Sequence, residues 1–108
     1  MVKKKLLIIT SLDDLEDIYN NLKKNFLIDY KKNITKSEIS KIIHRYHCIF
    51  TNPNNSKIYF GKLLLNKAKK LEAICTASTG TTHIDLNEIK IQNIKLISLK
   101  DKRREINK

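Results

Sequence analysis

Glycine and proline are scarce in this chain. Of its 108 residues, two are glycine, one is proline, and none is tryptophan. A G-x-G-x-x-G dinucleotide fingerprint needs closely spaced glycines. Gly61 and Gly80 lie far apart, so no such fingerprint can be drawn in this sequence. We therefore expect no cofactor to be bound by this chain itself.

Cysteine is equally rare. Cys48 and Cys75 each lie within an apolar run, and neither has a partner at metal-site spacing. Two isolated cysteines do not form a disulfide framework. We interpret both as buried thiols that act as small apolar side chains, and we expect no metal site.

Long apolar runs are also missing. No run approaches the roughly 20 residues that a membrane helix needs. The N-terminal residues "MVKKKLLIIT" have a basic start but lack a long apolar region and a small-residue cleavage site. This pattern indicates a first strand and not a secretory signal. We expect a cytoplasmic protein that makes no membrane contact.

Positive charge is abundant: 22 Lys and Arg stand against 11 Asp and Glu, a formal net charge of +11. Arginine, the residue that makes bidentate phosphate contacts, occurs only at Arg45, Arg103 and Arg104. The lysines are spread along the chain, and aromatic platforms for bases are few. We interpret the charge as solvated lysine faces and expect no nucleic-acid partner. A basic nucleic-acid-binding domain remains an alternative.

Five short apolar runs alternate with amphipathic segments, which is typical of strands alternating with helices. The expected strands are residues 3–10, 26–30, 47–51, 71–76 and 94–99. The expected helices open at Ser11, Thr35, about Gly61 and Asp85. Such alternation predicts an α/β fold, a flavodoxin-like five-stranded parallel sheet with helices on both faces. The length fits one domain.

The stretch "CTASTGTTHIDL", residues 75–86, follows the fourth expected strand. Ligands of open α/β sheets bind beyond the carboxyl ends of strands. Gly80 would let the backbone turn and a ligand approach closely. The backbone amides of Ser78, Thr79 and Gly80 could together form an anion-binding nest. The stretch therefore predicts a site for a small anion such as a carboxylate, or else a turn that needs glycine only for its shape.

Residues Leu71 to Lys100 contain, in order, "AICTAS", "STGTTH", "IDL" and "NIKLISL". This run resembles the N-terminal segment of the D-isomer-specific 2-hydroxyacid dehydrogenases. That family includes phosphoglycerate, D-lactate, glycerate and formate dehydrogenases. The resemblance implies that the amides of Ser78, Thr79 and Gly80 hold the carboxylate of a small 2-hydroxy or 2-oxo acid. This sequence differs from the family pattern at Ser78, where many relatives have a glycine.

The same resemblance implies what this sequence lacks. The family's enzymes use NAD, held by a second domain that also supplies the catalytic Arg, Glu and His. We expect residues 1–100 to be the substrate-binding domain, and the charged tail 101–108 to begin a linker towards a missing or separately encoded cofactor domain. The chain would then be a truncated oxidoreductase half, inactive alone and prone to self-association. A free-standing flavodoxin-like binding or regulatory module is the alternative.

Two further residues near the expected site are interpreted as structural. His83 precedes the Ile-Asp pair, whereas the family's acid/base histidine lies far downstream, so we assign no catalytic residue in this chain. Asp85 is expected to be a helix N-cap, with Glu88 three residues on as its capping-box partner.

Overall fold

A single parallel sheet forms the centre of the molecule. The computed structural model describes residues 3–10, 16–52, 57–76 and 83–98. The strands are β1 (Lys4–Ile8), β2 (Phe26–Tyr30), β3 (Cys48–Thr51), β4 (Ala73–Thr76) and β5 (Lys95–Ser98). Their order is β2-β1-β3-β4-β5, and every neighbouring pair is parallel. The predicted flavodoxin-like sheet is confirmed.

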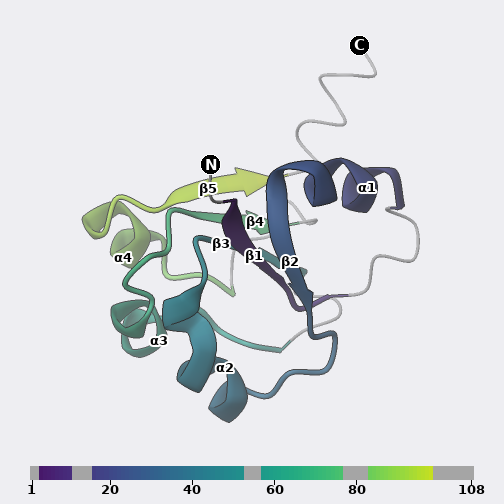
Figure 1. Ribbon diagram of the computed structural model, residues 1–108. Helices are drawn as coiled ribbons and strands as arrows, with labels where there is room; N and C mark the ends of the chain where they lie inside the picture. Colours follow the sequence, from purple (N-terminus) through teal and green to yellow (C-terminus); the bar gives the residue numbers. More distant parts are fainter. Residues whose placement is uncertain (1–2, 11–15, 53–56, 77–82, 99–108) are drawn as a thin grey trace.

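Helices cover both faces of the sheet (Figure 1). They are α1 (Glu16–Asn25), α2 (Lys36–Ile42), the short 3₁₀ helix η1 (Ile43–Arg45), α3 (Lys62–Lys67) and α4 (Leu86–Ile91). The chain runs outward from β1 to β2 and then returns to the other side of β1. Because parallel crossovers keep one hand, this reversal puts α1 on one face and α2, α3 and α4 on the opposite face. The predicted start of α1 at Ser11 lies outside the described residues.

Two apolar clusters fill the spaces between the layers. The larger one lies under α2, α3 and α4 and includes the fully buried Ile49, Phe60 and Ile74. The smaller one lies under α1 and is centred on Leu6, Ile8 and Phe50. Alternating side chains of β1 therefore serve both clusters, as expected for a strand buried on both faces.

Local sequence signals set the ends of the helices. Thr35 and Glu38 form the predicted capping box, in which each side chain bonds the other's backbone N–H. Helix α4 ends at Ile91 with Gln92 as its C-cap. The next residue, Asn93, has a positive φ of 57°, a conformation that Asn tolerates. The Ile94 N–H then donates to the Ile89 carbonyl at 2.8 Å. This is the bond pattern of a Schellman motif.

Helix α3 and the two cysteines depart from the sequence prediction. Helix α3 ends at Lys67, whereas the pattern that opens near Gly61 predicts a helix to about Lys70. Buried Leu71 packs into the larger cluster, so the chain has to turn before β4. Cys48 and Cys75 are only partly buried; the prediction of buried thiols was therefore too strong. Both pack at the margin of the smaller cluster.

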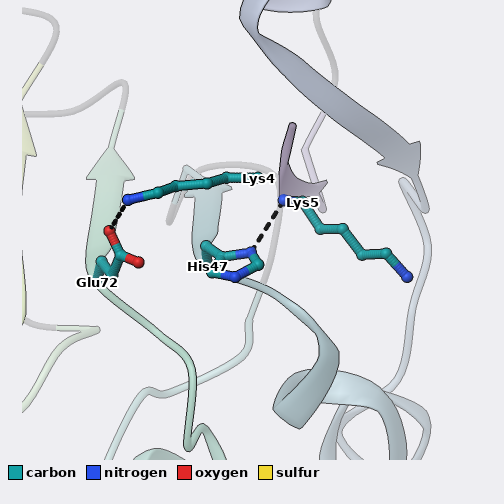
Figure 2. Close-up of polar contacts among 4 residues, drawn as sticks. All are labelled: Lys4, Lys5, His47 and Glu72. Atoms are coloured by element: carbon teal, nitrogen blue, oxygen red, sulfur yellow. Dashed lines mark hydrogen bonds and ion pairs between the residues drawn. The ribbon is translucent and has the colours of Figure 1, made fainter. Parts of the chain in front are cut away.

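His47 fixes the start of the sheet (Figure 2). Its backbone N–H donates to the Lys5 carbonyl at 2.9 Å, and its ring Nδ1 accepts from the Lys5 backbone N–H at 3.0 Å. Beside it, Lys4 Nζ lies 2.5 Å from Glu72 Oε1, with both side chains about half exposed. Such an exposed pair adds little stability, so the backbone pairing sets the register of β1 and β3.

Candidate functional site

The three central strands each lead into a buried threonine at the carboxyl edge of the sheet. Thr10 follows β1, Thr51 ends β3 and Thr76 ends β4; all three are 0% exposed. Thr51 and Thr76 are register partners, so their side chains lie on the same face. The buried hydroxyls show that the side chains change from apolar to polar at this edge of the sheet. The sequence signal, an apolar run closed by threonine in "LIIT", "CIFT" and "AICT", was missed.

A backbone bridge holds the start of α4 against the crossover that follows β3. Phe60 and Ile84 form an isolated parallel bridge. The Phe60 N–H donates to the His83 carbonyl at 2.8 Å, and the Asp85 N–H donates to the Phe60 carbonyl at 2.9 Å. Residues 57–60 alternate between exposed and buried, as a strand does, but sequence periodicity cannot identify the distant segment with which they pair.

The described residues that flank the stretch 77–82 are both held in the fold. Thr76 is paired with β3 on one side, and His83 is bonded to Phe60 on the other. The expected carboxylate-binding residues Ser78, Thr79 and Gly80 lie within this stretch, outside the described residues. Their assignment stays a prediction.

His83 lies between β4 and α4, beside the Phe60 bridge. It is 8% exposed, and its ring Nε2 lies 3.5 Å from Thr76 Oγ1. Its Nδ1 and the hydroxyl of Thr51 are both buried without a hydrogen-bond partner in the described part of the chain. Burial lowers the pKa of His83 below its ordinary value of 6.5, because the fold disfavours the charged ring. A neutral histidine therefore stands beside the end of β4.

Asp85 caps α4, as predicted: its Oδ1 accepts from the Glu88 N–H at 3.1 Å. The predicted reciprocal bond from Glu88 is not formed. The Glu88 carboxylate instead accepts from Gln92 Nε2 at 2.8 Å, one helical turn further on. This pairing at i, i+4 competes with the capping box for the same carboxylate.

Metal and membrane sites are not supported by the described residues. Within residues 3–10, 16–52, 57–76 and 83–98, no three His, Cys, Asp or Glu side chains come together as metal ligands. In those same ranges, no helix has the length and apolarity that a membrane crossing demands.

The fold is that of a parallel α/β domain with five strands. The family model described as "D-isomer specific 2-hydroxyacid dehydrogenase, catalytic domain" matches residues 7–103. The chain belongs to this family. No curated protein matches it.

Solved structures show the same fold at low sequence identity. A glyoxylate reductase from Paecilomyes thermophila superposes with a TM-score of 0.80 at 15% identity, over 91% of this chain and 32% of that one. The PH0520 protein of Pyrococcus horikoshii gives 0.78 at 21%, over 88% and 27%. The NAD⁺-bound 3-phosphoglycerate dehydrogenase of Entamoeba histolytica gives 0.75 at 16%, over 90% and 33%. The chain thus spans about a third or less of each structure.

Proposed function

We propose that this chain is the substrate-binding part of an NAD-dependent D-2-hydroxyacid dehydrogenase, and that it binds the carboxylate of a small 2-hydroxy or 2-oxo acid. The family match over residues 7–103 supports this proposal. The observation that carries it concerns the described residues on either side of 77–82: Thr76 is paired with β3 at the carboxyl end of β4, and the His83 carbonyl accepts from the Phe60 N–H. The carboxyl edge of the sheet is where open α/β sheets bind ligands.

The chemistry of the edge fits a small anion. Backbone amides of Ser78, Thr79 and Gly80 would donate to the carboxylate, since amides in a tight turn can converge on one anion. His83, kept neutral by burial, would line the site as a polar but uncharged side chain. The backbone amides would then supply the attraction for the anion. Affinity should be roughly millimolar, because one wall of a cleft cannot offset much of the entropy lost on association.

The activity of the whole enzyme is proposed to need a second part. Hydride transfer requires a nicotinamide held against the substrate carbon. Residues 101–108 are proposed to begin the linker towards that cofactor-binding part, which would also carry the acid/base groups. In this proposal the chain contributes substrate binding and orientation, and NAD is bound elsewhere.

Amide chemical shifts of ¹⁵N-labelled protein, titrated with pyruvate, glyoxylate and sulfate, test the site. We expect saturable shifts centred on Ser78, Thr79 and Gly80. Thr79→Pro removes one donor N–H and should abolish them, whereas Thr79→Ala keeps that N–H and should bind as the wild type does. Shifts confined to lysine-rich segments, or unaffected by Thr79→Pro, would show that the stretch is only a turn.

A further inference from the structure

The amino-terminal edge of the sheet, opposite the proposed substrate site, is densely basic. Lysines that are scattered in the sequence come together there, at the starts of strands and in the last turns of the helices that precede them. All are exposed in the described part of the chain. They are Lys3, Lys4, Lys5, Lys23, Lys24, Arg45, Lys67, Lys69, Lys70, Lys90 and Lys95. We call this set the basic edge.

The topology explains the gathering. In a parallel sheet with helical crossovers, every strand begins, and every preceding helix ends, at the same edge. Basic residues occupy the last turns of α1, α3 and α4. Helix dipoles favour cations at those positions. The dipole does not account for Lys3, Lys5 and Lys95, which lie before or at the starts of strands.

Acidic residues are segregated to the other side. Asp29 is the penultimate residue of β2, Glu38 lies in the first turn of α2, Asp85 is the N-cap of α4, and Glu88 lies in its first turn. Glu72 is the one carboxylate of the described residues at the basic edge, and it is paired with Lys4. The described residues record no carboxylate partner for the other basic-edge cations. Their charge is therefore not neutralised within that part of the fold.

Figure 2 shows how the edge presents its charge. The Lys4 side chain extends to Glu72, while the Lys5 side chain points away from both Glu72 and His47. The sheet is five strands wide, and neighbouring strands lie about 4.8 Å apart, so the basic edge spans roughly 19 Å. A nucleic-acid duplex of that length presents phosphates at about one charge per 1.7 Å of its axis.

We propose that the basic edge binds the phosphate backbone of a nucleic-acid duplex without sequence preference. Lysine ammonium groups bind phosphates as point charges, and the edge carries a single arginine, Arg45, for bidentate contacts. The large aromatic side chains that are most exposed, Tyr30 and Tyr59, lie outside the basic edge, one at the end of β2 and one in the crossover after β3. Of the described aromatic residues beside the basic edge, Tyr19, which lies under Lys23, and Phe26 are partly buried against the smaller cluster, so they offer little surface on which unpaired bases would stack.

An anionic membrane fits this edge less well. Membrane-surface binding needs apolar side chains that enter the lipid beside the cations. Leu27, Leu63 and Ile91 are exposed apolar residues on three separate elements, β2, α3 and α4. Leu63 lines a groove together with Lys67, but Leu27 lies on β2 at one border of the sheet, so the three do not form one continuous apolar surface.

Fluorescence anisotropy of two labelled DNA duplexes of about 20 base pairs and unrelated sequence tests the proposal, with KCl varied from about 50 to about 200 mM. The affinity should fall linearly on a log–log plot and be equal for the two sequences. The triple variant Lys69→Gln, Lys70→Gln, Lys95→Gln should reduce the salt slope by about three. A matched triple on the opposite side, Lys32→Gln, Lys36→Gln, Lys62→Gln, removes the same charge and should change the slope by less than about one.

Circular dichroism confirms that each triple variant is folded, and single Lys→Gln variants replace any that is not. Equal losses in both triples would overturn the proposal, since binding would then follow net charge and not the basic edge. Binding to phosphatidylserine vesicles without binding to either duplex would also overturn it. These outcomes are independent of the carboxylate titration, which concerns the opposite edge of the sheet.

Discussion

His83 Nε2 and Thr76 Oγ1 lie 3.5 Å apart across the junction between β4 and α4. The contact joins Thr76, the last residue of β4, to His83, which lies two residues before the N-cap of α4. Both side chains are buried, and the pKa of His83 is lowered by that burial. The neutral ring is therefore part of what holds the two sides of the proposed site together.

Acidification should destabilise the protein through His83. The folded state binds the proton more weakly than the unfolded chain does, so stability is fully present above pH 6.5, the ordinary His value, and is lost as the pH falls below it. Urea unfolding at a series of pH values between neutrality and about pH 5 measures this effect. His83→Asn should flatten the profile in that window, whereas the exposed His44→Asn should not. An unchanged profile in His83→Asn would contradict the assignment.

Loss of the Asp85 cap should loosen α4. Asp85→Ala removes the acceptor for the Glu88 N–H and should lower the free energy of unfolding by about 1 kcal/mol. Asp85→Asn keeps a capping oxygen and should cost only a few tenths of that amount. Chemical denaturation of the three proteins provides the comparison. Equal stability of Asp85→Ala and the wild type would mean that the packing of α4 alone sets its start.

The hydroxyl of Tyr46 donates to Asp29 Oδ2 at 2.5 Å and ties the end of η1 to β2. Tyr46→Phe should lower stability by about 1 kcal/mol, the usual net contribution of such a bond. Burial, then the bond to Asp29, raises the pKa of Tyr46. Stability should consequently fall as the pH rises above 10, where the unfolded tyrosine ionises and the folded one does not. Tyr46→Phe should remove that alkaline loss, while Tyr30→Phe, exposed on the edge strand, should retain it.

The purified chain should bind NADH no better than a protein without a cofactor site. The sequence offers no closely spaced glycines for a pyrophosphate. NADH fluorescence and absorbance assays with D-lactate, D-glycerate and their 2-oxo counterparts measure binding and turnover. Affinity near 1 μM, or turnover above background, would show that the substrate-binding assignment is incomplete.

Self-association should increase with ionic strength. Cys48, Cys75 and Ile97 lie on the sheet face that α1 covers, and all three remain partly exposed. The charge of +11 opposes association, but salt screens it beyond about 10 Å at 0.1 M. Sedimentation velocity at low and high salt should show growing association, reduced in Ile97→Ser and unchanged in Ile91→Ser. A monomer at both salts would favour a free-standing module with a finished surface.

The order of the elements follows from the sequence pattern, but many of their bounds do not: of the five expected strands, only residues 26–30 match the observed strand at both ends. Apolar runs such as "LLII" and "AIC" are short, flanked by polar residues and regularly alternated with amphipathic segments, which favours strands. Thr35 and Asp85 predict the starts of α2 and α4, because an N-cap side chain bonds the backbone N–H three residues further along the chain. The parallel order followed from the alternation, because a strand–helix–strand crossover has one preferred hand.

Features that depend on residues distant in the chain required the three-dimensional structure. The Phe60–Ile84 bridge joins two segments that the sequence pattern does not pair, and the junction buries His83 beside Thr76. Lysines that the sequence spreads evenly become a basic edge, because parallel strands all begin on one side. Periodicity reports which face of an element is apolar, whereas the register and the crossovers decide which distant side chains share an edge.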